Sequence, residues 1–162
     1  IWFVSGLVMV YVPFPSLSRA ERLAGLAPID WRQVRVQPGD ALRAAGLTEP
    51  PRTMALEMLG RRPVWRIDPC DGQQTTLSAL DGRRIGSASR AEAAHTAALF
   101  ANAPVRAMTR VERDQWTVAG GFDRHRPLWK AELAGPGGRV LYVSSTSGAV
   151  AASKVLKWLV PR

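Results

Sequence analysis

Apolar and charged residues alternate most clearly in two short segments, 64–68 and 128–133. Successive side chains of a strand point to opposite faces of a sheet, so each segment predicts a strand with one buried face. On the apolar side lie Trp65, Ile67, Trp129, Ala131 and Leu133. On the charged side lie Arg66, Asp68, Lys130 and Glu132.

Further elements are predicted around these two strands. Turn formers such as Gly60, Asp71-Gly72 and the glycines of 135–138 separate short segments, which favours hairpins and antiparallel sheets. The additional strands are expected at 53–59, 75–80, 116–122 and 140–145, with an extra one at 105–112.

A helix is expected before each group of strands. The first runs from Asp40 to Leu47, with Asp40 as its cap and Gly46 as its end. The second runs from Ser89 to about Ala101, where Ser89 and Glu92 match a capping box.

The two groups resemble each other in sequence at an offset of 64 residues. Five identities fall within thirteen positions, where chance gives about one. They pair Thr53 with Thr117, Ala55 with Ala119, Arg62 with Arg126, Pro63 with Pro127 and Trp65 with Trp129. After a two-residue insertion, Gly82 matches Gly148. We therefore expect an α+β fold of two tandem repeats, each a helix packed on a three- or four-stranded antiparallel sheet.

The two ends of the chain suggest a membrane. Residues 1–12 carry no charge, and Tyr11, Pro13 and Phe14 suit an exit at the lipid–water interface, so residues 1–15 read as the end of a truncated transmembrane helix. A buried strand or core helix is the alternative. Residues 154–162 place lysines beside Trp158, which suits the approach to a following membrane span or an ordinary amphipathic helix. Between the ends we expect a connecting segment, 16–35, a first repeat, 36–86, and a second repeat, 87–153.

The chain carries 22 Lys+Arg against 13 Asp+Glu, a formal net charge of +9 over 162 residues. Residues 1–81 hold nine basic and eight acidic residues, a net of +1, whereas residues 82–162 hold thirteen and five, a net of +8. The arginines are dispersed, and no finger, basic helix or RNA-binding sheet motif is present, so we do not expect a nucleic-acid partner.

No catalytic, cofactor-binding or metal-binding residues are nominated. His95 and His125 fall on different elements and lack the spacing of metal ligands. Asp123 near His125 suits a turn-stabilising pair better than an oriented imidazole. Cys70 stands alone in a turn, and Ser144 to Ser147 lack a nucleophile motif. The matched Trp65 and Trp129 suit core packing better than a ligand-stacking surface.

Arg126-Pro-Leu-Trp-Lys130, followed by Tyr142-Val143 and Gly148-Ala-Val150, resembles the PepSY domain. Ser144 stands where that domain usually has aspartate, and Ala149 where it usually has an acidic residue. Residues 6–17 resemble the end of the first membrane helix of PepSY-associated transmembrane proteins. The resemblance implies two tandem PepSY-like repeats on the periplasmic or outer side of a bacterial inner membrane.

The resemblance leaves three functions open. The first is a non-catalytic interaction or regulatory module, linked to iron and siderophore uptake and acting on a protein partner. The second is the periplasmic part of a heme-bearing ferric-siderophore reductase, in which the heme would lie in membrane helices that this chain lacks. The third is a peptidase-inhibitory domain.

Overall fold

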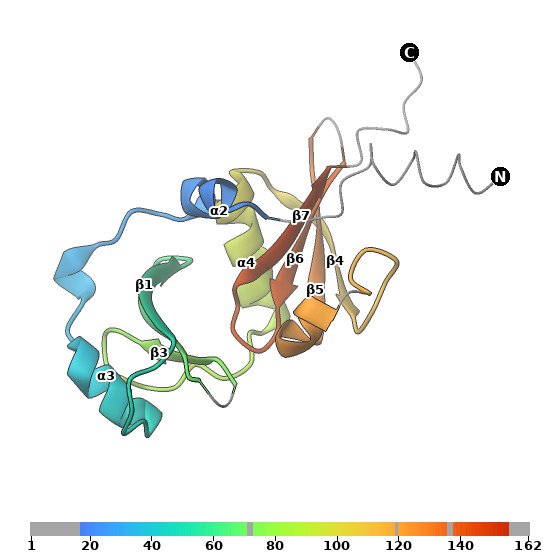
Figure 1. Cartoon of the computed structure of the whole chain (residues 1–162). Coiled ribbons are helices and arrows are strands. Elements are labelled where there is room, and N and C mark those ends of the chain that lie inside the picture. The colour runs from blue at the N-terminus through green and yellow to red at the C-terminus, as the bar shows by residue number, and fades with distance from the viewer. Residues whose placement is uncertain (1–16, 71–72, 119, 136–137, 156–162) are drawn as a thin grey trace, which may run out of the picture.

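The computed structural model describes residues 17–70, 73–118, 120–135 and 138–155. These residues form an α+β fold with two antiparallel sheets, of order β1-β2-β3 and β4-β5-β6-β7 (Figure 1). The helices are α2 (Arg19–Gly25), η1 (Trp31–Gln33), α3 (Pro38–Ala45), α4 (Arg90–Ala101) and η2 (Gly120–His125). The strands are β1 (Thr53–Leu59), β2 (Arg62–Asp68), β3 (Thr75–Ser78), β4 (Val105–Val111), β5 (Leu128–Leu133), β6 (Arg139–Ser144) and β7 (Val150–Val155).

We call α3 with β1–β3 the first unit and α4 with β4–β7 the second unit. In the first unit, Trp65 and Ile67 of β2 pack with Ala41 of α3 and Leu77 of β3. In the second unit, α4 covers one face of the sheet, and its buried residues contact those of β5, β6 and β7. Trp65 is therefore confirmed as a core residue, and Trp129 is half-buried and packs against the core of the second unit.

The prediction of a strand at 116–122 is wrong. The first strand of the second sheet is β4, at the place where an extra strand was expected. Residues 114–117 form a turn instead, because the Asp114 carboxylate accepts hydrogen bonds from the Trp116 amide (3.0 Å) and the Thr117 hydroxyl (2.9 Å). These local bonds satisfy the backbone without a neighbouring strand.

Both predicted helices form, with one correction to a cap. Ser89 caps α4, and the capping box with Glu92 is present. In α3, however, Asp40 is not the cap: the helix begins at Pro38 after Gln37, because proline at the first helical position has a suitable φ and needs no amide partner. Gly46 ends α3 in the left-handed conformation, as expected.

Four regular elements were not predicted: α2, η1, η2 and β7. Helix α2 lies within the expected connecting segment, and its own capping box joins Ser18 to Glu21. Strand β7 pairs with β6 and includes residues 154 and 155 of the segment expected to approach the membrane. The expected span at 1–15 and residues 156–162 lie outside the described residues. None of the helices in the described part of the chain has the length and apolarity needed to cross a bilayer.

The two units use the same backbone turn after their third strand. In the first unit the Gly82 amide donates to the Ser78 carbonyl (2.9 Å), and the Ala79 amide donates to the Pro63 carbonyl (2.9 Å). In the second unit the same two bonds join Gly148 to Ser144 (2.9 Å) and Ser145 to Pro127 (3.0 Å). Both glycines have positive φ, +72° and +68°, which explains why glycine stands at each turn.

The indole nitrogens of the two matched tryptophans also have equivalent partners. Trp65 donates to the carbonyl of Val36 (2.9 Å), the residue just before the N-cap of α3. Trp129 donates to the carbonyl of Ala88 (2.9 Å), the residue just before the N-cap of α4. Each tryptophan therefore fixes the start of its helix against the second strand of its sheet.

The two turn glycines predict unequal effects of the same substitution. A Cβ on Gly148 would lie 3.0 Å from Leu59 Cδ1, whereas a Cβ on Gly82 would have its nearest neighbour, Val36 Cγ2, at 3.8 Å. Gly82→Ala should lower the free energy of unfolding by about 1 kcal/mol, because the alanine must adopt the left-handed backbone conformation. Gly148→Ala should lower it by about 2–3 kcal/mol, because the new Cβ also crowds Leu59. Urea unfolding of both variants measures the difference; equal losses would contradict the crowding against Leu59.

Candidate functional site

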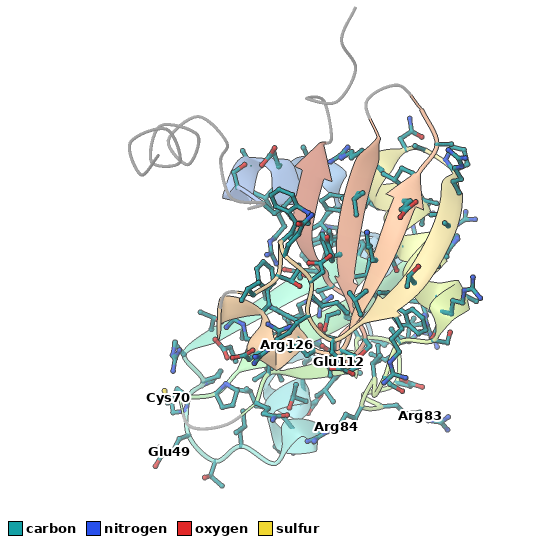
Figure 2. All side chains as sticks on the ribbon, turned by 90° about the vertical axis from the view of Figure 1, so that its right-hand side faces the viewer. Glu49, Cys70, Arg83, Arg84, Glu112 and Arg126 are labelled. Atoms are coloured by element: carbon teal, nitrogen blue, oxygen red, sulfur yellow. The ribbon has the colours of Figure 1, made fainter. Side chains whose placement is uncertain are left out.

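The residues considered for catalysis do not come together. His95 is exposed on α4, and Cys70 is a free, exposed thiol at the periphery of the first unit (Figure 2). Ser145 to Ser147 form the β6–β7 turn, as expected of turn residues. Across the described ranges no group of three or more His, Cys, Asp or Glu side chains could hold a metal ion.

Asp123 and His125 both lie in η2 but bind different partners. The Asp123 carboxylate accepts a hydrogen bond from Arg126 Nε at 2.7 Å and lies 3.6 Å from Arg113. His125 Nε2 accepts a bond from Arg124 (3.3 Å), and the buried Nδ1 has no hydrogen-bond partner among the described residues. Burial, and secondarily the positive charge of Arg124, lower the pKa of His125 from its usual value near 6.5 to about 4.

This lowered pKa predicts a loss of stability in mild acid. Between pH 6.5 and 4 the unfolded chain binds a proton at His125 that the folded chain does not, so stability falls as the pH is lowered. From pH 7 to pH 5 we expect a loss of about 1 kcal/mol, after allowing for partial exposure to water. The measurement is urea unfolding of the wild type and of His125→Gln. The free energy of unfolding of the variant should hardly change between pH 7 and pH 5. If the variant loses as much stability as the wild type, the titration of His125 is not the cause.

Arg126 cross-links different parts of the long segment between β4 and β5. Its guanidinium donates to the Thr117 carbonyl (2.6 Å) and to the carbonyl of Glu112, beside which it lies in Figure 2. Trp116 and Phe122 of this segment pack against a buried cluster that includes Tyr142, on the face of the sheet opposite α4. Since both faces of this sheet are covered, neither offers an open binding surface over these residues.

The Tyr142 hydroxyl also anchors this segment by donating to Asp114 at 2.6 Å. Burial, with the bond to Asp114, raises the pKa of Tyr142. Burial alone would raise the pKa of Asp114, but bonds from Tyr142, Trp116 and Thr117 outweigh it and lower that pKa. The polar groups of this region therefore stabilise one another, which fits a structural role.

A buried ion pair lies at the junction of the two units. Arg66 of β2 donates from Nε to Glu57 of β1 at 2.6 Å, with side chains only 7% and 19% exposed. Arg66 Nη1 also donates to the Thr76 hydroxyl and to the Ser147 carbonyl of the second unit, both at 3.2 Å. Burial lowers the pKa of Arg66, and the neighbouring Glu57 opposes this shift. Arg66 thus links the charged face of the first sheet to the β6–β7 turn.

A groove of about 610 Å³ opens beside this ion pair. Four segments border it: the end of α2 with the chain leading to η1, the end of β1, the second half of α4, and the start of β7. Leu99 and Phe100 contribute apolar surface, and Leu99 is 47% exposed. Arg22 and Arg61 contribute positive charge. The volume is in the range of ligand-binding clefts.

The groove is bordered by the end of strand β1 along its edge rather than by the face of a sheet. Glu57, Met58 and Leu59 of β1 all line it, although successive residues of a strand point to opposite faces. Gly148 and Ala149 of the β6–β7 connection line it together with Val150, the first residue of β7. Since β1 is an outer strand of its sheet, its free edge borders the groove.

Comparison of the chain with protein-family models, with curated proteins and with solved structures found no match. The groove and its geometry therefore carry the functional argument.

The sequence pattern did not indicate the groove. Its four borders are far apart in sequence, and α2, one of them, was placed in a connecting segment. One local signal was available: Ser18-Arg-Ala-Glu21 matches the same capping-box pattern that located α4. The burial of Arg66 has no such signal, because part of its surroundings, including the Ser147 carbonyl, comes from the other unit.

Proposed function

We propose that this chain is a tandem PepSY-like, non-catalytic interaction module of a bacterial inner-membrane protein. In this proposal the module faces the periplasm or cell exterior and takes part in iron and siderophore uptake. The observation that carries the interaction role is the groove at the junction of the two units, bordered by Arg61 and Leu99. The residues that line it include no serine, cysteine or histidine, and the carboxylates of Asp30 and Glu57 among them already accept hydrogen bonds.

The duplicated architecture supports the tandem-repeat part of the proposal. Both units have a helix followed by antiparallel strands, and both repeat the bonds of Trp65 and Trp129 to the residue before the helix cap. The turns at Gly82 and Gly148 repeat the same backbone bonds. Such agreement at several independent positions is expected of duplicated units, which reuse their core and turn chemistry.

The location is tested on the full-length gene product with reporter fusions placed after residue 153. An alkaline phosphatase fusion should be active and a fluorescent-protein fusion dark, because the first folds outside the cytoplasm and the second inside. The opposite pattern would refute the extracytoplasmic location. A heme absorbance band in the purified full-length protein would instead favour the ferric-siderophore reductase.

The role of the groove is tested by growth on a ferric siderophore as the sole iron source. A chromosomal Leu99→Asp allele should reduce growth to the level of the gene deletion, because it places a charge on the apolar wall. Arg90→Glu, an exposed change at the other end of α4, should grow as the wild type. If the deletion fails to grow but Leu99→Asp grows normally, the groove is not the interaction site. If the deletion itself grows normally, the link to iron uptake is wrong.

A further inference from the structure

We propose that the groove binds an extended acidic segment of a partner protein, which adds as a strand to the free edge of β1. This inference rests on the proposed interaction function and names the chemistry of its partner. The supporting features are the free strand edge, the apolar wall of α4 and the arginines at the rim.

The hairpin register shows which groups of β1 are free. Leu59 and Arg62 flank a two-residue turn, and residues flanking such a turn form a hydrogen-bonded pair. Residues 53, 55, 57 and 59 therefore bond to β2, and residues 54, 56 and 58 present their amides and carbonyls on the other side. Among the described segments none pairs with β1 there. Such an edge can accept an extended peptide.

One wall of the groove is apolar. Successive side chains of an added strand would point to opposite sides, as in any sheet. Leu99, 47% exposed, and Phe100 offer an apolar surface to one set. Covering Leu99 would remove apolar surface from water, which favours binding.

The charges at the groove favour a negative partner. Arg22 and Arg61 line it and have no ion-pair partner among the described residues. The carboxylates present are already engaged: Glu57 pairs with Arg66, and Asp30 caps η1 by accepting from the Arg32 amide. Carboxylates of a ligand would therefore find two available guanidinium groups, which bind them in a bidentate geometry.

The net charge also argues against a second copy of this chain as the occupant. Each copy carries +9, so two copies repel one another over a long range. The same charge attracts an acidic protein and accelerates its encounter with the groove.

The test is a fluorescence-anisotropy titration of the purified chain with a labelled ten-residue peptide that alternates glutamate and valine. Three matched peptides serve as controls: one with lysine for glutamate, one with proline at every third position, and one with alternate amides N-methylated. We expect binding of the acidic peptide, weakened by added salt, and at least tenfold weaker binding of all three controls. Equal binding of the N-methylated peptide would refute strand addition.

Variants of the chain test whether the peptide binds in the groove. Arg61→Glu and Leu99→Asp should each weaken binding at least tenfold, while Arg90→Glu, a charge reversal outside the groove, should leave it within twofold. Equal losses in all three would mean that net charge alone attracts the peptide. Binding to vesicles containing anionic lipid, with none to the peptide, would overturn the proposal in favour of a membrane surface. Because this assay needs neither a membrane nor iron, its failure is distinct from failure of the location or uptake tests.

Discussion

Replacing Arg66 with methionine should lower the free energy of unfolding by about 3–5 kcal/mol. The substitution leaves Glu57 without its cationic partner in a side-chain environment that is only 19% exposed. It also removes the donor to the Ser147 carbonyl, a bond that joins the first sheet to the second unit. Losing one partner of a buried ion pair costs far more than the pair contributes, because the remaining charge stays desolvated. Urea unfolding followed by circular dichroism measures the loss.

The same strand offers a matched control for this result. Arg62 also belongs to β2 and pairs with Glu92 at 3.0 Å, but both side chains are more than half exposed. Arg62→Met should therefore cost less than about 1 kcal/mol. A double variant, Arg66→Met with Glu57→Leu, should recover part of the loss because no unpaired charge remains. Equal effects of the two single arginine variants would mean that burial of the Arg66 pair does not determine its contribution.

Replacing Trp129 with alanine should lower the free energy of unfolding by about 3 kcal/mol, because it removes a large, half-buried side chain that packs against the core beneath α4. Trp129→Phe should lower the free energy of unfolding by about 1–3 kcal/mol, mainly because the Ala88 carbonyl loses the indole N–H that donates to it. Trp65→Phe should cost a similar amount, since Trp65 makes the equivalent bond to Val36.

Trp31 is the control for these tryptophan substitutions. It is 70% exposed in η1, so Trp31→Ala should change the free energy of unfolding by no more than about 0.5 kcal/mol. Thermal or urea unfolding of the four variants orders their effects. A loss for Trp31→Ala as large as that for Trp129→Ala would show that burial does not set the order.

Local signals predicted much of each unit. Alternation located β2 and β5, and the prediction of 53–59 and 128–133 as strands is confirmed. The capping box at Ser89 located α4, because its hydrogen bonds join residues only three apart in the sequence and so can be read locally. Where the signal was weaker, the prediction failed. A strand was expected at 116–122 because this segment corresponds to 53–59 in the repeat, yet the bonds of the Asp114 carboxylate close a turn there.

Strand β7 illustrates what pattern alone does not reveal. Its residues, Val150 to Val155, do not alternate clearly between apolar and charged types. The segment becomes a strand because β6 offers it a pairing edge, a condition set by residues outside the segment. Strand formation depends on such non-local pairing more than helix formation does.

The sequence by itself determined the α+β class, the first, second and third strands of the first unit, the N-cap of α4 and the glycine at each turn. These features depend on side-chain periodicity and on bonds between near neighbours. Only the tertiary structure decided that Arg66, on the charged face of its strand, is buried, and that four distant segments enclose a groove beside it. Both depend on how one unit packs against the other, because burial is set by which surfaces meet and not by the residues within one element.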